Sequence, residues 1–190
     1  QRVGVDVKHR RGSLRPPEAL RVGKGARRQA LAFDLDTYRL LLKRLTVRGT
    51  PGHGSMPFRR DNALVKAAGV VQRLADYRPA ARFTELWRTR VDTLGLPDEM
   101  RSVLLDEQSI ETFLDELGSV PAAAHLHACT HTTFSPNLVD GGAMKTNVIP
   151  DHVVVNVDIR TLPGEGADEV DAHLRAALGD LADHVEVEII

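Results

Sequence analysis

The stretch Gly49-Thr50-Pro51-Gly52-His53-Gly54-Ser55-Met56-Pro57 decides how the neighbouring chain can fold. Its glycines, prolines and serine exclude regular secondary structure. An alternating apolar and polar run precedes it, and an amphipathic pattern opens after it at Asn62. The stretch therefore predicts a strand that ends in a turn and is followed by a helix. His53 would then lie at a loop tip, where it is either a binding group or merely a solvated turn residue.

Periodicity in the flanking segments predicts an α+β domain. The expected elements are a strand over 42–48, a helix over 61–76, a strand over 122–133, a strand over 152–160, a helix over 167–181 and a last strand over 185–189. The order β-α-β-β-α-β predicts a ferredoxin-like fold, in which a four-stranded antiparallel sheet carries two helices on one face. The apolar stripes expected on the two helices are Leu64, Ala67, Ala68, Val71, Leu74 and Ala75, and Val170, Leu174, Ala177, Leu178 and Leu181.

A helical insertion is expected over about 80–120, where three short apolar stripes follow one another. Their residues are Phe83, Leu86, Trp87 and Val91, then Met100, Val103 and Leu104, then Ile110, Phe113, Leu114 and Leu117. Pro97 starts the second stripe and Gly118 closes the third. Aromatic and aliphatic residues at this spacing favour a packed core over a ligand pocket.

Residues 122–133 alternate as a strand would, which gives their polar side chains a common face. The residues expected on that face are His125, His127, Cys129 and His131. Side chains at i and i+2 of a strand lie roughly 6.5 Å apart, so two could share a zinc ion, although four could not converge. A polar sheet face or a contact with a cleft is the other interpretation. The segments 134–137 and 140–142 are expected to be turns.

Composition places the chain among ordinary globular proteins. Hydrophobic residues make up 42% and charged residues 27% of its 190 residues, which suits one domain with an appendage. The single cysteine, Cys129, excludes an internal disulfide and fits a reducing, cytoplasmic compartment.

No apolar run approaches the roughly 18 residues of a membrane helix, so no membrane contact is expected. The ends at Gln1 and Ile190 lead us to expect a fragment of a longer chain.

Charge is distributed unevenly along the chain. Residues 1–44 hold 12 Lys and Arg against 4 Asp and Glu, whereas the remainder holds 13 against 22. Residues 1–40 are therefore predicted to be a basic N-terminal arm of uncertain structure. Nucleic-acid binding is not expected, because the arm lacks interleaved aromatic residues and the net charge of the whole chain is -1.

Three motifs together resemble the M20 family of metallopeptidases. The first is RGTPGHGSMP at 48–57, followed by the Asn-Ala pair at 62–63, which is similar to Gly-x-x-Gly-His-x-Ser-x-Pro…Asn-Ala. The second is DGGAMKTNVIPD at 140–151, similar to Gly-Gly-x-x-x-Asn-Val-Ile-Pro. The third is DIRTLPG at 158–164, similar to Asp-x-Arg…Pro-Gly. All three belong to the lid, or dimerisation, domain of that family, and the resemblance covers about residues 41–190.

The resemblance implies roles for five residues. His53 matches the lid histidine that stabilises the oxyanion in the active site of the partner subunit, in trans. Asn147 matches a residue that contacts substrate, and Arg160 matches an arginine that holds a substrate carboxylate, for which a planar guanidinium is suited. Gly141 and Gly142 would let their loop turn close to the substrate. Without the resemblance, Arg160 would be an exposed sheet arginine with an acidic neighbour, and Asn147 a turn residue.

The family includes zinc-dependent aminoacylases, succinyl-diaminopimelate desuccinylases, acetylornithine deacetylases and carboxypeptidases. The resemblance implies two zinc ions, bridged by a water and held in a separate catalytic domain by a His-x-Asp motif and adjacent glutamates. This sequence contains neither motif. We therefore expect no metal site or cofactor in this chain and no hydrolysis by the chain alone.

The expected partners are a second copy of the lid in a homodimer, the catalytic domain of the same parent chain, and a peptide or N-acyl amino acid substrate. The alternative is a stand-alone ferredoxin-like module for protein interaction or regulation.

Overall fold

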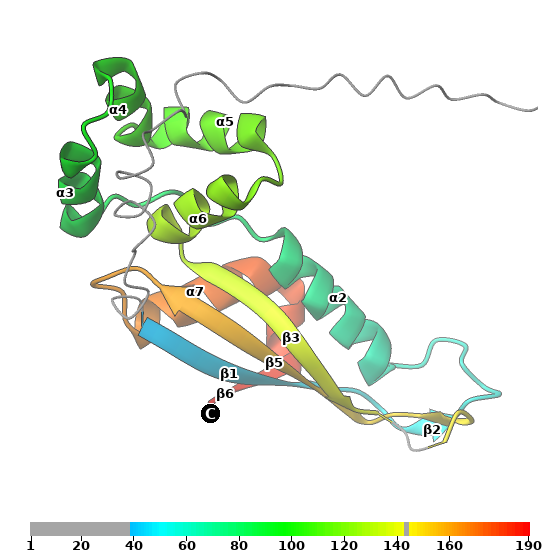
Figure 1. The fold of residues 1–190 in the computed structure, drawn as a ribbon. Helices are drawn as coiled ribbons and strands as arrows, with labels where there is room; N and C mark the ends of the chain where they lie inside the picture. The colour runs from blue at the N-terminus through cyan, green and yellow to red at the C-terminus, as the bar shows by residue number, and fades with distance from the viewer. Residues whose placement is uncertain (1–38, 143–144) are drawn as a thin grey trace, which may run out of the picture. The chain divides into compact units, whose positions relative to one another are not determined.

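A computed structural model describes residues 39–142 and 145–190 (Figure 1). The basic arm predicted for residues 1–40 lies outside the described residues, except that residues 39 and 40 begin the first strand. None of the described helices is long and apolar enough to cross a bilayer.

The described elements follow one another in the order expected for an α+β domain with a helical insertion. They are β1 (Arg39–Arg48), β2 (Gly52–His53), α2 (Ala63–Asp76), α3 (Glu85–Thr93), α4 (Asp98–Leu104), α5 (Glu107–Leu117), α6 (Pro121–Thr130), β3 (Thr133–Gly141), β4 (Val148–Ile149), β5 (His152–Thr161), α7 (Ala167–Leu178), η3 (Gly179–His184) and β6 (Val185–Ile189).

The four long strands form one antiparallel sheet in the order β3-β5-β1-β6. The two central strands pair over ten residues, from Arg39 opposite Thr161 to Arg48 opposite His152. The short strands β2 and β4 form a separate ribbon. Since sequential strands are not all neighbours and two helices make the crossovers, this is the predicted ferredoxin-like fold, and the fold class is confirmed.

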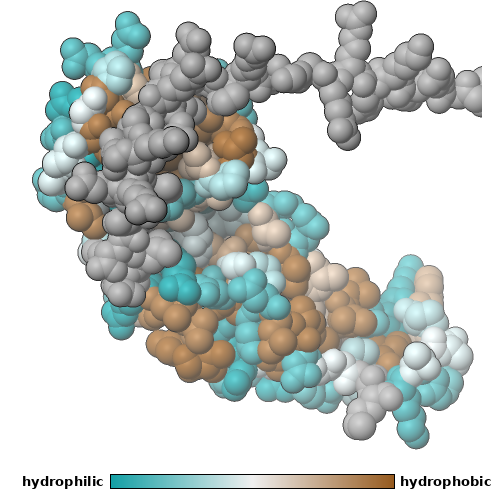
Figure 2. Space-filling model, in the orientation of Figure 1, coloured by the Kyte–Doolittle hydropathy of each residue, from teal (hydrophilic) through white to brown (hydrophobic). Residues whose placement is uncertain are grey.

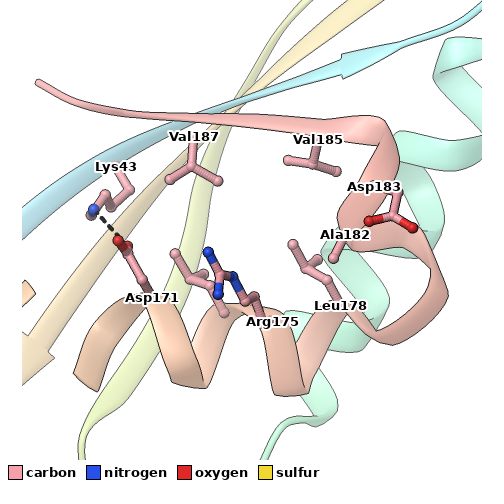
Figure 3. A pocket seen from close by; sticks show the side chains of 9 residues that line it. Lys43, Asp171, Arg175, Leu178, Ala182, Asp183, Val185 and Val187 are labelled. Carbon is pink, nitrogen blue, oxygen red and sulfur yellow. Dashed lines mark hydrogen bonds and ion pairs between the residues drawn. The ribbon is translucent and has the colours of Figure 1, made fainter. Parts of the chain in front are cut away.

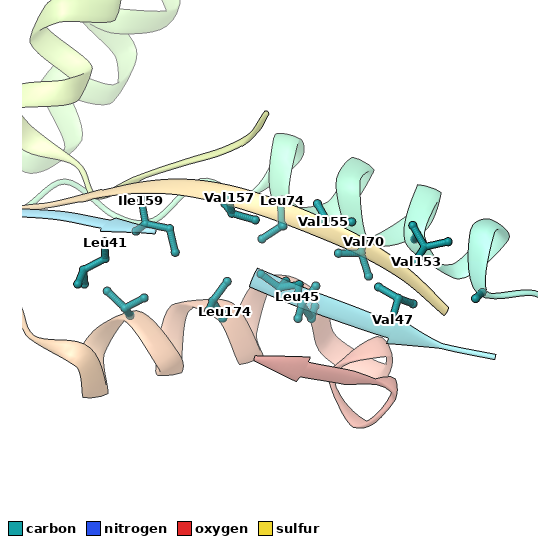
Figure 4. Close-up of a cluster of buried hydrophobic side chains, with 14 residues drawn as sticks. Leu41, Leu45, Val47, Val70, Leu74, Val153, Val155, Val157, Ile159 and Leu174 are labelled. Atoms are coloured by element: carbon teal, nitrogen blue, oxygen red, sulfur yellow. The ribbon is translucent and has the colours of Figure 1, made fainter. Parts of the chain in front are cut away.

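The core lies between the sheet and the helices α2 and α7 (Figure 4). Its buried residues come from alternate positions of β1 and β5 and from one stripe on each helix, namely Leu41, Leu45, Val47, Val153, Val155, Val157, Ile159, Ala63, Ala67, Val70, Leu74, Val170, Leu174 and Leu178. Both helices therefore cover the same face of the sheet. The inward alternation predicted for the strand over 152–160 is confirmed.

The strand predicted over 122–133 is wrong, because residues 121–130 form α6. Pro121 stands in its first turn, where proline is tolerated, and the alanines that follow favour a helix over a strand. The third strand of the sheet lies instead at β3, where turns were expected at 134–137 and 140–142. A β-bulge between Pro136 and Leu138 accommodates the proline in this edge strand.

The face of α2 that is buried is rotated about the helix axis relative to the face expected from the sequence. Ala67 and Leu74 are buried as predicted, but Ala63 and Val70 complete the stripe, while Leu64 is 52% exposed. Apolar residues cover much of this helix, so periodicity alone does not fix the face that meets the sheet. Asn62 caps the helix by accepting a hydrogen bond from the backbone N–H of Leu64.

Two details at the C-terminal end also differ from the prediction. α7 ends at Leu178 because Gly179 adopts a φ of 56°, and the chain continues as η3. Val187 and Ile189 of β6 lie opposite the inward-facing Leu45 and Lys43, so they face inward as predicted, but they are 41% and 64% exposed rather than buried. β6 is an edge strand, and the groove between it and α7 leaves this side of the strand open.

Lys43 interrupts the apolar inward positions of β1 and is only 3% exposed. Its ammonium group donates to the Asp171 carboxylate of α7 at 3.0 Å, beside a groove of about 660 Å³ between α7 and β6 (Figure 3). A buried ammonium group needs such a partner, so this ion pair fixes α7 against the sheet. Sequence periodicity gave no sign of it.

Gly49 lies where the end of β1, the start of α2 and the start of β5 meet. Its N–H donates to the carbonyl of Asp151 at 2.7 Å, and a Cβ added to it would lie 2.5 Å from the backbone nitrogen of Ala63. No side chain fits there without moving the backbone.

We expect Gly49→Ala to lower the free energy of unfolding of the chain by about 1–3 kcal/mol, because the added methyl group overpacks a backbone contact. Gly52→Ala is the matched control. A Cβ at Gly52 would find its nearest neighbour, the Cδ1 of Ile149, at 3.5 Å, which is ordinary van der Waals distance. Urea unfolding of both variants makes the comparison, and equal stability of the two would contradict this account of the junction.

Candidate functional site

The His53 loop, residues 49–60, is held by backbone hydrogen bonds across its own base and to the segment around Asn147. Thr50 donates to the carbonyl of Asp61 at 2.7 Å. His53 pairs with Val148 in the ribbon of β2 and β4, so the expectation that this stretch holds no regular secondary structure is wrong for these two residues. Gly54 then donates to the carbonyl of Asn147 at 2.7 Å. The histidine predicted at a loop tip is therefore fixed between two defined backbone segments, and its side chain is exposed.

Ser55 determines which nitrogen of the His53 ring carries the proton. The backbone N–H of Ser55 donates to His53 Nδ1 at 3.2 Å, and the Ser55 hydroxyl lies 2.8 Å from the same nitrogen. Because Nδ1 accepts a hydrogen bond, the neutral ring carries its proton on Nε2. This leaves the Nε2–H group of the exposed side chain as its free hydrogen-bond donor. The sequence motif includes Ser55 but assigns it no role, although its position two residues after the histidine is a usable signal.

Asn147 lies directly beside the His53 loop, as the sequence motifs suggested. A Cβ at Gly54 would come within 3.0–3.1 Å of the backbone of Asn147, so glycine permits this close approach. Gly141 and Gly142 end β3 at the same end of the sheet, with φ of 89° and 96°, which glycine adopts readily. The structure thus gathers four of the five predicted site residues at one end of the domain.

Arg160 lies at the other end. It occupies β5 eight residues beyond His152, the residue at the end of that strand near His53. At about 3.3 Å per residue, this separation is roughly 26 Å. Its guanidinium group makes two hydrogen bonds to Asp158, at 2.8 and 3.1 Å, as the sequence interpretation without a ligand anticipated. Within one chain, His53 and Arg160 cannot contact the same small molecule.

The histidines predicted to share a strand face lie on and beside α6. His127 and His131 stack with ring centroids 4.1 Å apart, and His131 Nε2 lies 2.8 Å from the Glu111 carboxylate of α5. Among residues 39–142 and 145–190, no three His, Cys, Asp or Glu side chains are arranged to hold a metal ion. The strand geometry behind the zinc alternative is wrong, and the cluster instead joins two helices of the insertion.

Burial lowers the pKa of His127 from 6.5 to about 4, with repulsion from His131 as the next cause. Arg78 also lowers this pKa, whereas the Glu111 carboxylate raises it. The ring is therefore neutral in the folded protein at neutral pH.

Together, the ferredoxin-like sheet and the exposed histidine define a small α+β domain with a hydrogen-bonded histidine loop at one end of its sheet. Residues 41–186 match the peptidase dimerisation domain of the M20 family, and the chain belongs to this family.

Solved structures with a similar fold include three metallopeptidases or peptidases, each aligned over 80% of this chain. They are an M20 family metallo-carboxypeptidase from Sulfolobus solfataricus (16% identity, TM-score 0.49, 37% of that chain covered), human carnosine dipeptidase 1 (15%, 0.47, 36%) and aminopeptidase PepT from Bacillus cereus (17%, 0.43, 28%). The chain thus spans little more than a third of these proteins at most. The comparison with curated proteins finds no match.

The low pKa of His127 makes stability depend on pH in a defined direction. The unfolded chain binds a proton at this residue below about pH 6.5, whereas the folded chain resists protonation down to about pH 4. Its contribution to stability is therefore present above pH 6.5 and is lost as the pH falls through this window. We expect His127→Gln to weaken the decline in unfolding free energy between these values.

Urea unfolding at a series of pH values checks this, with His184→Gln as the control because His184 is exposed. An identical decline in wild type and His127→Gln would show that the buried ring is not responsible.

Proposed function

We propose that this chain is the dimerisation and substrate-closing lid of an M20-type zinc-dependent peptidase or amidohydrolase, which cleaves an amide bond of a peptide or an N-acyl amino acid, as aminoacylases do. The observation that carries the proposal is the His53 side chain, exposed on a hydrogen-bonded loop with its Nδ1 atom bound by Ser55 and Nε2 left as the donor. Membership of the M20 dimerisation family supports the reaction class. A cytoplasmic location accords with the single cysteine.

The zinc ions belong, in this proposal, to a catalytic domain outside this chain. The residues here do not fit a zinc pair, because the sequence has no His-x-Asp motif and no adjacent glutamates, and the described residues form no three-ligand group. When bound in the catalytic domain, the metal supplies polarisation of the scissile carbonyl. This chain supplies binding and a hydrogen-bond donor.

His53 would act when the scissile carbonyl is attacked and its oxygen becomes negative. The Nε2–H group can donate to that oxygen, while Ser55 holds the ring at Nδ1. A donor fixed in advance stabilises the oxyanion without reorganisation at the moment of reaction, and such donors are worth about 10² to 10³ in turnover. Asn147, fixed to the same loop, would contact the substrate nearby.

Two copies of the chain are needed to complete the site. Arg160 would hold a substrate carboxylate, but it lies at the end of β5 away from His53. The described chain also enters β1 and leaves β6 toward that end, since Ile189 pairs with Lys43 and Val185 with Val47. A catalytic domain joined there would lie near its own Arg160. His53 would then reach the active site of the second subunit of a homodimer.

In the full-length parent protein, we expect His53→Ala to lower turnover about 10²- to 10³-fold, with a smaller change in substrate affinity. Mixing this variant with a variant that lacks a zinc ligand should restore activity. In such heterodimers, one active site combines an intact zinc pair with an intact histidine. Steady-state kinetics before and after subunit exchange provide the measurement.

Subunit exchange must be verified independently, for example with differently tagged copies. If exchange occurs and activity does not return, the histidine acts within its own chain or has no part in the reaction.

A further inference from the structure

The tip of the His53 loop carries an exposed aromatic side chain that the proposed chemistry does not use. Phe58 is 80% exposed, and Met56 two residues earlier is 56% exposed. The face drawn in Figure 2 shows hydrophobic areas interrupted by hydrophilic ones. Single exposed apolar residues are normal on a protein surface. This pair differs because it stands on the loop that presents His53.

The backbone is strained at the residue that follows Phe58. Arg59 has a φ of 54°, and among the described residues no other non-glycine residue has a positive φ. Arg60 donates to the carbonyl of Pro57 at 3.2 Å, which closes a turn with Phe58 and Arg59 at its centre. The second central position of such a turn usually holds glycine or asparagine when φ is positive. Strain of this kind persists where the surrounding structure enforces it, often at functional sites.

The phenyl ring lies exposed on this turn and does not pack onto the domain. The Arg59 guanidinium carbon lies 5.0 Å from the centroid of the Phe58 ring, within the range of a cation–π contact. Met56 donates to the carbonyl of His53 at 3.0 Å, so the apolar tip and the histidine belong to one hydrogen-bonded unit. A partner that binds the ring therefore also fixes the position of the imidazole.

We propose that Phe58, supported by Met56, is a positioning residue that docks the His53 loop into an apolar pocket on a second copy of the parent protein. The proposal rests on the proposed function, in which His53 works in the partner's active site. The second copy is the occupant because the chain's own entry and exit lie at the other end of β1. The exposed Arg59 and Arg60 at the tip predict carboxylates at the rim of that pocket.

The test uses the full-length parent protein with Phe58→Ala, Phe58→Leu and the control Leu86→Ala, which removes an exposed apolar side chain from α3. We expect Phe58→Ala to lower turnover about tenfold, Phe58→Leu to retain most of it, and Leu86→Ala to leave it unchanged. Unfolding of the single chain should be unaffected by Phe58→Ala, because the ring is exposed there.

The decisive comparison is Phe58→Ala in a His53→Ala background. If the ring acts only by placing the histidine, the second change should have no further effect on turnover. An unchanged turnover in Phe58→Ala alone, or an equal loss in both backgrounds, would overturn the inference. An unchanged turnover in His53→Ala would instead overturn the proposed function, so the two failures are distinguishable.

Discussion

The antiparallel pairing of β1 with β5 is the constraint on which the rest of the structure depends. Ten consecutive residue pairs fix the register of the two central strands. Their inward-facing residues form the sheet side of the hydrophobic core. The same register determines where the residues of the candidate site lie along the strand pair. It places the His53 loop beyond one end of the pair and Arg160 at the other. In the proposed function, a site about the size of an amino acid that uses both residues therefore needs a second copy of the chain.

The loop at the first end is held in place by contacts that can be traced residue by residue. Gly49 allows three segments to meet at backbone distance, and Gly54 allows the loop to lie against Asn147. Ser55 orients the histidine ring, and the Phe58 ring lies exposed on the strained turn at Arg59. Because the loop is ordered in the single domain, little conformational entropy remains to be lost when it enters a site. A small entropy cost on binding suits a group that must be placed accurately over a reacting carbonyl.

Sequence patterns correctly predicted features that depend only on neighbouring residues, such as the ends of helices. The cap at Asn62 and the stop at Gly118 follow from side-chain and backbone preferences, and both are observed. The sequence over 122–133 misled because short alternation also occurs in an alanine-rich helix, where composition was the better guide. The Lys43–Asp171 pair joins residues 128 apart, so no local pattern contains it. The motifs located the His53 loop and Asn147 correctly, but the distance to Arg160 depends on strand register, which only the folded chain shows.

The most direct test of a shared site is a crystal structure of the parent protein with a carboxylate-bearing, amide-like inhibitor bound at the metal centre. The account predicts that one inhibitor molecule contacts Arg160 of one subunit and His53 of the other, with His53 Nε2 within hydrogen-bond distance of the oxygen that mimics the scissile carbonyl. An inhibitor that contacts both residues from the same subunit, or a closed site with His53 far from that oxygen, would contradict it.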